Sequence, residues 1–530
     1  MKYDFIVVGA GSSGAIIASR LSENPSISVL LLEGGPDYPD FKKLPDDIKF
    51  GYSTGTYIAV GPEHDWGYIA KVNGYESGGL SRYIRTPRGK ITGGTSSING
   101  QIFLRGLSHD FELWKSLGLT DWSYEEVLPY FRKLETDLDF SGDFHGEDGP
   151  IIAHRFPRSQ WSRSQKGFFE SAINLGYRET RDMNYPDASG VGPFPCNNPN
   201  GIRISTAVGH LSQARHRLNL TVSPNSTVNK IILDKQKVSS LEVESGGSTY
   251  LAQGENVVLC AGAIANPKIL MLSGIGPKAH LEKIGISTQV DLPGIGQNLS
   301  DHPINFVKAS VKDIDDLDTQ KPCLQVGLRY TASESNIEDD MLMWMNSYSL
   351  STDYREVETI STQGNLHNQD VDGIQIAVSV YFATSKGRIQ LNSIDPKDSP
   401  DLFLNLLDTD KDVERMAEGI RIAKDLMESK PMRPLIQNIT SPTNYILNSR
   451  ESFHNWLRTN TVTGHHLTGT CRMGSDTDEM SVVDSNGKVK GLSNLYIADA
   501  SIMPESVRAN TNATTMMIGE KISAHLETNH

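Results

Sequence analysis

The chain has 530 residues, more than one hydrophobic core usually serves, so we expect two or three domain-sized units. Acidic residues outnumber basic ones by 64 to 50, and the net charge of −14 argues against a nucleic-acid partner, because it repels phosphate. A strand pattern begins almost at residue 1 and no apolar run is long enough to span a membrane. We therefore expect a cytoplasmic protein without signal peptide or membrane span.

The four cysteines lie far apart in the chain, at Cys196, Cys260, Cys323 and Cys471. They form no CxxC motif and no Cys/His pair with the spacing of a zinc site. The pattern predicts free thiols in a reducing compartment and no metal centre.

The first fourteen residues carry the strongest local pattern. The apolar run 5–8 precedes Gly9, Gly11 and Gly14 in the spacing GxGxxG, followed by a helical pattern at 15–21 and a second strand at 28–32 that ends in Glu33. Such glycines let the backbone approach a pyrophosphate at a helix N-terminus, and an acid about twenty residues on accepts a hydrogen bond from a ribose hydroxyl. The unit predicts dinucleotide binding.

The segments that follow are less regular. Residues 36–85 lack sustained periodicity and are predicted to be loop, and 87–100 is a second glycine and hydroxyl cluster that suits either a bound phosphate or ring edge or a surface loop. Residues 122–135 predict a helix with Ser123 and Glu126 as a capping box. Residues 145–200 are rich in Pro, Gly and Asp, which predicts a connection into another domain.

Strand patterns return at 220–222, 228–233, 239–244 and 256–260, and a strand–turn–helix with Pro267 in its first turn follows at 261–276. The doubly wound domain therefore resumes there. Farther on, 341–345 and 374–382 predict strands, and 412–429 predicts an amphipathic helix. The Met, Trp, Tyr and Phe side chains of these strands suit either a core or a pocket wall.

Five motifs in order resemble the glucose–methanol–choline (GMC) flavin oxidoreductases: GAGSSG at 9–14 with Glu33, then 89–99, 262–276, 294–302 and the C-terminal block from 464. The resemblance implies an α/β fold, with a Rossmann-type FAD-binding domain at 1–150, 201–302 and 461–530. It also implies an α+β substrate domain on an antiparallel sheet at 151–200 and 303–460. The layout is most similar to bacterial choline dehydrogenase-like and hydroxymethylfurfural oxidase-like members.

The resemblance also assigns the cofactor, which is FAD. Two positions depart from the family motifs, Thr92 and Asn266, and neither removes a catalytic group. Some members bind the flavin covalently through a histidine at the position of Ile98, so we expect non-covalent FAD here. The cofactor-binding residues that the motifs imply are Gly9, Gly11, Ser13, Gly14, Glu33, Gly34, Arg88, Gly93, Gly94, Thr95, Ser97, Asn99, Gly100, Val228, Ala261, Asp499, Ala500, Asn510 and Thr511.

The chemistry is expected at His465-His466 and at Asn510. Two adjacent histidines by themselves also suit a structural role. The resemblance places His466 at the flavin ring with Asn510 as its partner, and leaves His465 as a neighbour of undefined role. A histidine with a pKa of about 6.5 takes the proton of an alcohol at neutral pH, hydride passes to flavin N5, and the imidazolium stabilises the reduced flavin.

The predicted reaction is the oxidation of a small alcohol, most similar to that of members acting on primary aryl or aliphatic alcohols, with electrons passed to O2 or another acceptor. A redox-silent lyase of the hydroxynitrile type remains the alternative, since some relatives cleave cyanohydrins on this fold. A non-enzymatic flavin-binding protein is disfavoured because it gives His466 and Asn510 no task. The sequence leaves the oligomeric state open.

Overall fold

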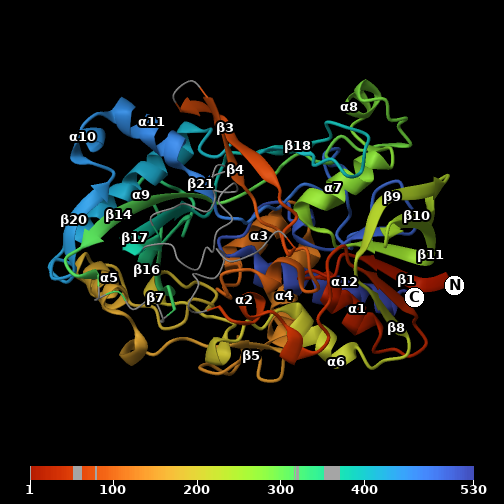
Figure 1. The fold of residues 1–530 in the computed structure, drawn as a ribbon, viewed down its shortest axis with the longest axis horizontal. Coiled ribbons are helices and arrows are strands. Elements are labelled where there is room, and N and C mark those ends of the chain that lie inside the picture. Colours follow the sequence, from red (N-terminus) through yellow and green to blue (C-terminus); the bar gives the residue numbers. More distant parts are fainter. Residues whose placement is uncertain (1, 52–62, 78–79, 315–316, 318–321, 351–370) are drawn as a thin grey trace.

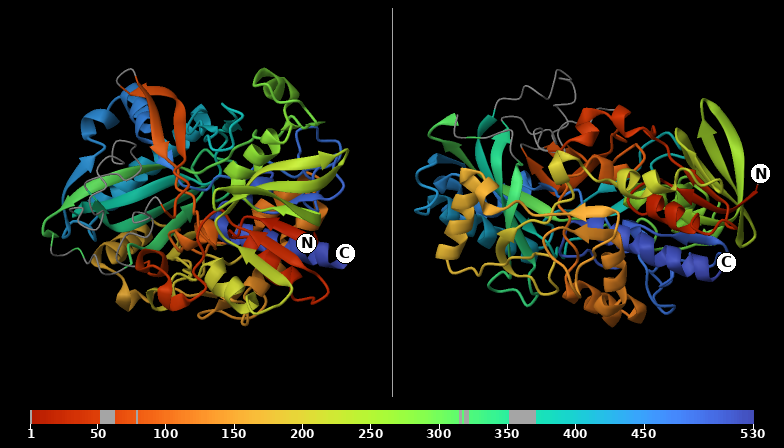
Figure 2. Two further views of the ribbon diagram at one scale, coloured as in Figure 1. Left: turned by 45° about the vertical axis from the view of Figure 1, so that its right-hand side comes forward. Right: turned by 90° about the horizontal axis from the view of Figure 1, so that it is seen from below.

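Two large sheets lie next to each other in the computed structural model, which describes residues 2–51, 63–77, 80–314, 317, 322–350 and 371–530 (Figure 1). The N-terminal strand belongs to the first sheet, the chain ends in a helix beside it, and Figure 2 shows the two termini close together. There the ring of His530 packs 5.1 Å from that of Phe5. The α/β fold with a second, antiparallel sheet is as the sequence predicts.

The first sheet is built on the predicted N-terminal unit. β1 (Lys2–Val8), α1 (Gly14–Leu21) and β2 (Val29–Leu32) follow one another, and β1 pairs in parallel with β2 and with β11 (Ser248–Leu259). β8 (Leu220–Ser223) and β22 (Leu495–Ile497) extend the parallel part on either side. In the middle of this sheet, residues 5–8, 29–32 and 257–259 are buried throughout, which explains their continuous apolar runs.

β11 is longer than predicted because its two halves pair with different strands. Its second half pairs with β1, and its first half pairs antiparallel with β10 (Lys237–Ser245), which in turn pairs with β9 (Ser226–Asp234). The long C-terminal helix α12 (Thr511–Thr528) packs against α1. The carboxyl ends of β1 and β2, the start of α1 and the start of α12 thereby meet on one side.

Helix α7 (Gly262–Leu272) contains Pro267 as its sixth residue, so the prediction of a first-turn proline was wrong. Proline has no N–H to donate to the carbonyl four residues earlier. That carbonyl belongs to Ala263, and the hydroxyl of Thr470 donates to it at 2.7 Å. A residue 207 positions away thus replaces the missing helical hydrogen bond.

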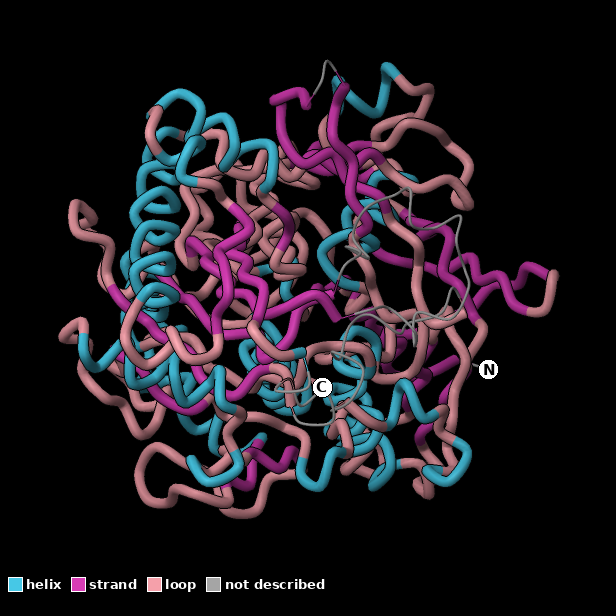
Figure 3. Tube along the Cα trace, turned by 60° about the vertical axis from the view of Figure 1, so that its left-hand side comes forward, coloured by secondary structure: helices cyan, strands magenta, loops and turns pink. Residues whose placement is uncertain are grey.

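The second sheet is antiparallel, in the order β20-β14-β17-β16-β15-β7, with β21 (Val462–Thr463) paired beside β20 along β14. Helices α9 (Asp410–Glu428) and α5 (Arg163–Asn174) pack on one face, and Figure 3 shows this helical layer along the strands. The strands are β7 (Gly190–Pro193), β14 (Pro303–Val311), β15 (Leu324–Tyr330), β16 (Met341–Leu350), β17 (Val371–Val380) and β20 (Ile436–Ser441).

Three local predictions were wrong. The segment 36–85 contains the hairpin β3 (Ile69–Ser77) and β4 (Leu80–Arg85), and 145–200 contains α5 and β7 rather than only a connection; residues 52–62 and 78–79 lie outside the described part. Ser123 does precede α4 (Tyr124–Leu134), but its side chain makes no capping hydrogen bond.

The hairpin joins distant segments. β3 pairs with β19 (Asp401–Phe403), which pairs with β18 (Arg388–Gln390). The remaining elements are short: α2 (Asp46–Lys49), α3 (Ser108–Ser116), β5 (Glu135–Asp137), β6 (Ile151–Ala153), α6 (Ser212–Ala214), β12 (Ile275–Gly276), α8 (Lys278–Lys283), β13 (Val290–Asp291), α10 (Asn444–Leu447) and α11 (Arg450–Asn460). Within the described ranges, no helix has the length and apolar character that crossing a membrane requires.

Candidate active site

A cavity of about 710 Å³ lies between the two sheets. Its wall runs from the ends of β1 and β2, past residues 87–102, to the inner face of β14 and β16. The loop at 463–467, residues 499–500 and the first turn of α12 close it. The cavity thus collects four of the five motif segments, and none of the described residues of the remaining segment, 294–302, is in its wall.

Most of the predicted site residues line this cavity. They are Gly9, Gly11, Ser13, Glu33, Gly34, Arg88, Gly94, Thr95, Asn99, Gly100, Val228, Ala261, His466, Asp499, Ala500, Asn510 and Thr511. Gly14, Gly93 and Ser97 are not in the wall, and they support it from behind. A Cβ on Gly14 would lie 1.9 Å from the Gly9 carbonyl oxygen, and Ser97 donates to the Thr92 carbonyl at 2.9 Å.

The glycine turn brings backbone to the cavity surface at the N-terminus of α1. Gly9 has a φ of +96°, and a Cβ on Gly94 would lie 2.6 Å from the Cα of Gly11, so position 94 must lack a side chain for the two segments to approach this closely. Glu33 closes the turn by accepting the N–H groups of Ala10 at 2.9 Å and Gly35 at 2.8 Å. Burial raises the pKa of Glu33 to about 7.

The two departures from the family motifs are both hydrogen-bonded. The Thr92 hydroxyl donates to Asp37 at 2.7 Å. Asn266 accepts the Ala261 N–H at 2.9 Å and donates to Asp499 at 2.8 Å and to Ser501 at 3.0 Å. Each replacement therefore ties down a segment beside the cavity.

At the other end of the cavity three side chains form a row. Nε2 of His466 lies 3.0 Å from Nδ2 of Asn510, and Nδ1 of His466 lies 2.9 Å from Nδ1 of His302. His302 immediately precedes β14, His466 follows β21, and Asn510 precedes α12. The sequence predicted His466 and Asn510 but assigned no role to His302, although it ends the motif at 294–302.

The proton positions in this row follow from the contacts. With Asn510 donating through Nδ2, Nε2 of His466 is an acceptor, so neutral His466 carries its proton on Nδ1 and donates it to His302. His302 then carries its own proton on Nε2, which faces the Ser506 hydroxyl at 3.3 Å. The unprotonated nitrogen of His466 is therefore Nε2, next to Asn510.

Backbone contacts fix the loop that carries His466. Asp301 accepts the N–H groups of His466 at 2.9 Å and His302 at 2.8 Å, and it also accepts the Thr463 hydroxyl. A Cβ on Gly464 would lie 2.8 Å from the His302 carbonyl oxygen and 3.1 Å from Nδ1 of His466. Contacts next to β14 and β21 thus fix the row, and the missing side chain at Gly464 leaves room for it.

The rings around His302 are closely packed. His302 is fully buried and stacks on Tyr381, with 4.3 Å between ring centroids and an interplanar angle of 11°. Burial and the neighbouring His466 hold the pKa of His302 well below its usual value. It therefore stays neutral and remains available as an acceptor.

Burial and the charge of Arg88 lower the pKa of His466 to about 3. The sequence-based expectation of a base titrating near 6.5 was wrong, because it took the imidazole to be surrounded by water. His466 lines the cavity and is neutral, ready to accept a proton, across the physiological range.

His465 has a different environment. Its φ of +64° places a non-glycine residue in the left-handed region, and its N–H donates to the Thr463 hydroxyl at 2.8 Å. Backbone strain of this kind costs of the order of 1–3 kcal/mol and gathers at functional sites. His465 also lines the cavity, so it adjoins the reaction site directly.

Residues that the sequence did not single out complete the wall. Trp66 and Tyr68 stack with 6.5 Å between ring centroids, and Lys90 lies 5.0 Å above the Trp66 ring. Two aromatic residues on either side of a glycine in a loop-like segment were the available signal. On the second sheet, Ile304, Phe306, Leu324, Trp344 and Asn346 face the cavity. Trp344 thus lines a pocket, whereas Met341, Met343 and Met345 are core residues.

The lining fits a flavin dinucleotide. The turn at α1 and the paired glycines offer a backbone surface for a pyrophosphate. Two buried polar atoms at the start of α12, Oδ1 of Asn510 and Nδ2 of Asn512, have no partner in the protein and remain for a bound molecule. Asn512 is fixed by the Ser12 hydroxyl, which donates to its Oδ1 at 2.8 Å.

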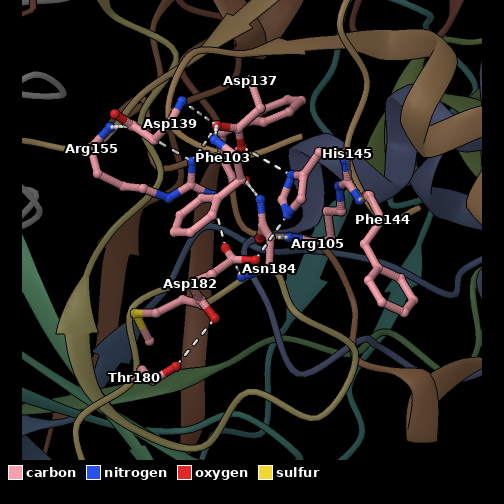
Figure 4. A network of polar contacts seen from close by, with 12 residues as sticks. Phe103, Arg105, Asp137, Asp139, Phe144, His145, Arg155, Thr180, Asp182 and Asn184 are labelled. Atoms are coloured by element: carbon pink, nitrogen blue, oxygen red, sulfur yellow. Dashed lines mark hydrogen bonds and ion pairs between the residues drawn. The ribbon is translucent and has the colours of Figure 1, made fainter. Parts of the chain in front are cut away.

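A second polar cluster lies outside the cavity (Figure 4). Glu135, Asp137 and His145 place possible ligand atoms within 4.8 Å of one another. However, Arg105 pairs with Glu135, and Arg155 pairs with Asp137 at 2.6 Å and with Asp182 at 2.8 Å. Together with protonated His145, these arginines balance the three buried carboxylates. We call this set the buried charge cluster and assign it no metal.

The comparisons with known proteins agree along the whole chain. Two family models for GMC oxidoreductases match, an N-terminal one at residues 3–304 and a C-terminal one at 383–519. The oxygen-dependent choline dehydrogenase of Pectobacterium atrosepticum is 34% identical, over 99% of this chain and 94% of the relative. The corresponding enzyme 1 of Chromohalobacter salexigens is also 34% identical, over 98% and 94%.

Among solved structures, pyridoxine 4-oxidase from Mesorbium loti matches with a TM-score of 0.88 and 26% identity, over all of both chains. A fungal aryl-alcohol oxidase matches with a TM-score of 0.82 and 19% identity, over 100% and 99%, which supports the fold alone. Together with the cavity, these matches show that the chain belongs to the GMC oxidoreductases and is an FAD-dependent alcohol oxidoreductase.

Proposed function

We propose that this enzyme oxidises a neutral primary alcohol with an aryl or aliphatic body to the aldehyde, with His466 as the catalytic base. The observation that carries the proposal is the row His302–His466–Asn510 at the cavity wall. It leaves Nε2 of a neutral, buried imidazole unprotonated beside an amide N–H. An alcohol hydroxyl that displaces this amide N–H donates to Nε2 of His466 and accepts from Nδ2 of Asn510.

Each residue of the row has one task. His466 takes the hydroxyl proton at Nε2, and Asn510 holds the alcohol oxygen and so orients the carbinol carbon. FAD, when bound, supplies the acceptor for the hydride. The imidazolium that forms on His466 keeps donating through Nδ1 to His302, which shares the charge.

The cofactor-binding residues divide along the cavity. The turn with Gly9, Gly11 and Ser13 receives the pyrophosphate, and Glu33 binds the ribose. Residues 88–100, with Asp499 and Ala500, receive the flavin end. All these residues belong to the FAD-binding domain outlined above. Ile98 offers no nucleophile at the position where some family members attach the flavin, so FAD is held non-covalently.

The substrate end supports a neutral, apolar alcohol. Among the described residues, its wall on β14, β15 and β16 of the second sheet is Ile304, Phe306, Leu324 and Trp344, with a single amide. The acidic residues in the described part of the cavity wall are Glu33, Glu244 and Asp499, which all come from the first-sheet side. Choline, the substrate in the relatives' names, is a cation, and the described part of the cavity wall on the second sheet offers it no carboxylate.

The test is anaerobic mixing of the FAD-loaded enzyme with an alcohol panel, followed by exposure to air. Flavin bleaching that depends on the alcohol identifies oxidation, and rapid return of colour in air identifies O2 as an acceptor. A cyanohydrin lyase would leave the flavin oxidised with every alcohol. Choline preferred over benzylic and aliphatic alcohols would refute the substrate class.

The role of His466 has its own variant. His466→Ala should keep FAD bound but slow flavin reduction by about 10²–10⁴-fold, the usual contribution of a general base. His465→Ala should cost much less, and Asn510→Ala should lie between the two. Reduction of His466→Ala at the wild-type rate, with FAD fully bound, would show that another group is the base.

A further inference from the structure

Among the described residues that β14, β15 and β16 of the second sheet contribute to the cavity wall, one side chain is polar. Asn346 on β16 lines the cavity, only 3% of it is exposed, and its Oδ1 has no hydrogen-bond partner. A buried amide oxygen left unpaired costs about 1–3 kcal/mol. Buried polar atoms are normally satisfied, so an exception in a cavity calls for an absent partner.

Strand geometry shows that Asn346 faces the cavity. Side chains two apart on a strand share a face, and both Trp344 and Asn346 line the cavity, whereas Met343 and Met345 are buried in the core. The register of β16 against β17 is regular up to Asn346, and the irregularity against β15 between Asn346 and Trp344 places the extra residue on β15, so β16 keeps its alternation. The amide therefore stands beside the Trp344 ring.

The neighbours across the strands leave the amide unpaired. Asn346 pairs in register with Leu324 on β15, which is apolar, and with Gln375 on β17, which does not line the cavity. Ile304 and Phe306 complete the surrounding wall. The group that completes the hydrogen bonding of Asn346 thus comes from the cavity side.

We propose that Asn346 is a specificity-determining residue that accepts a hydrogen bond from a second polar group of the substrate, an O–H or N–H remote from the carbinol. The inference rests on the proposed function, because His466 and Asn510 already take the reacting hydroxyl. The substrate class narrows to neutral primary alcohols whose apolar or aromatic body carries a further hydrogen-bond donor.

The experiment compares matched substrates in the FAD-loaded enzyme. Benzyl alcohols with a hydroxyl at the 2, 3 or 4 position are compared with those carrying a methyl at the same position, because the two groups are similar in size and differ in donating a hydrogen bond. For at least one position, wild-type kcat/KM should favour the hydroxyl by about 10–10²-fold, as expected for a buried hydrogen bond.

Asn346→Leu, close in shape, should bring that ratio near one by losing activity on the hydroxylated substrate while retaining it on the methylated one. The dissociation constant of the matching hydroxybenzaldehyde, read from the flavin absorbance, should rise by a similar factor. Gln375→Leu is the control: it removes the amide opposite Asn346 in register but outside the cavity wall, and should leave the ratio unchanged.

The outcomes separate this inference from the proposed function. If His466→Ala slows flavin reduction but wild type and Asn346→Leu show the same ratio at every ring position, the role of Asn346 is refuted and the oxidation mechanism stands. If no alcohol reduces the flavin, the proposed function fails and the inference with it.

Discussion

Replacing His302 tests whether the second histidine selects the active form of the base. In His302→Leu, Nδ1–H of His466 loses its acceptor inside a buried site. The alternative tautomer, with the proton on Nε2, has no unpaired N–H toward residue 302, and Oδ1 of Asn510, which has no partner in the protein, accepts its Nε2–H once that amide turns over. We expect His466 to change to that tautomer, which cannot accept a proton at Nε2.

The size of the effect follows from the cost of a buried unpaired donor. That cost is about 1–3 kcal/mol, and each 1.4 kcal/mol is a factor of ten in an equilibrium. The active tautomer should therefore become about 5- to 150-fold scarcer, and alcohol-dependent flavin reduction should slow by the same factor. This is less than the loss expected for His466→Ala, which removes the base itself.

The assay is anaerobic stopped-flow reduction at saturating alcohol, with the thermal midpoint and FAD content measured on the same samples. His302→Gln keeps a side-chain acceptor and should recover part of the rate. Because both tautomers are neutral, the pH profile between 6 and 9 should stay flat in each variant. If His302→Leu reduced its flavin at the wild-type rate, the tautomer argument would be refuted. If the variant were slow and its rate now changed with pH between 6 and 9, the role of His302 would be purely electrostatic.

Three further predictions concern the cofactor and the fold. Acid precipitation should leave the yellow colour in the supernatant, since Ile98 cannot bond FAD; colour in the pellet would show a covalent link. Thr470→Val should cost about 1–3 kcal/mol of stability by orphaning the Ala263 carbonyl, and should cost much less in a Pro267→Ala background, as thermal melts would report. Burial opposes protonation of His145, but hydrogen bonds to its three carboxylate partners raise its pKa to about 10. The stabilisation by the buried charge cluster is thus complete below the unfolded pKa of about 6.5 and is lost as pH rises toward 10. The thermal midpoints of wild type and His145→Gln should differ most at pH 6 and converge by pH 10; a constant difference would show that charge is not the cause.

The sequence predicts elements whose signal is local. The run 5–8, the glycines at 9–14 and Glu33 lie within one supersecondary unit, so their spacing alone determines the turn. The helix at 412–429 is recognised from its apolar period, and the structure places α9 at Asp410–Glu428. Here the residues that decide the structure are neighbours in the chain.

Elements that depend on distant partners were missed. The hairpin β3–β4 is irregular in composition and extends through β19, more than 300 residues later. The helix α5 lies in a stretch of turn-forming residues, and its packing against β15 and β16 is tertiary. Such tertiary contacts override the local propensity for helix or strand, and they cannot be predicted from the pattern of a single sequence.

The motifs indicated the groups of the candidate site but not their environment. Family motifs indicated His466 and Asn510, yet the low pKa of His466 depends on burial and on Arg88, and its tautomer depends on His302. The low pKa and the tautomer of His466 arise only when the fold brings Arg88, His302 and His466 together. The chemical type of a residue can therefore be read from a motif, whereas its protonation state requires the fold.

The start of α12 connects the two ends of the cavity. Asn510 contacts Nε2 of His466, and two residues later Asn512 accepts a hydrogen bond from Ser12 in the glycine turn. His302 and His466 are likewise joined through β14 and β21, where Ile304 pairs with Val462. A single helix terminus thus relates the proposed base, which lies on the second sheet's side, to the glycine turn on the first. Because both contacts come from one helical turn, the distance between base and cofactor turn is set by rigid backbone rather than by flexible loops.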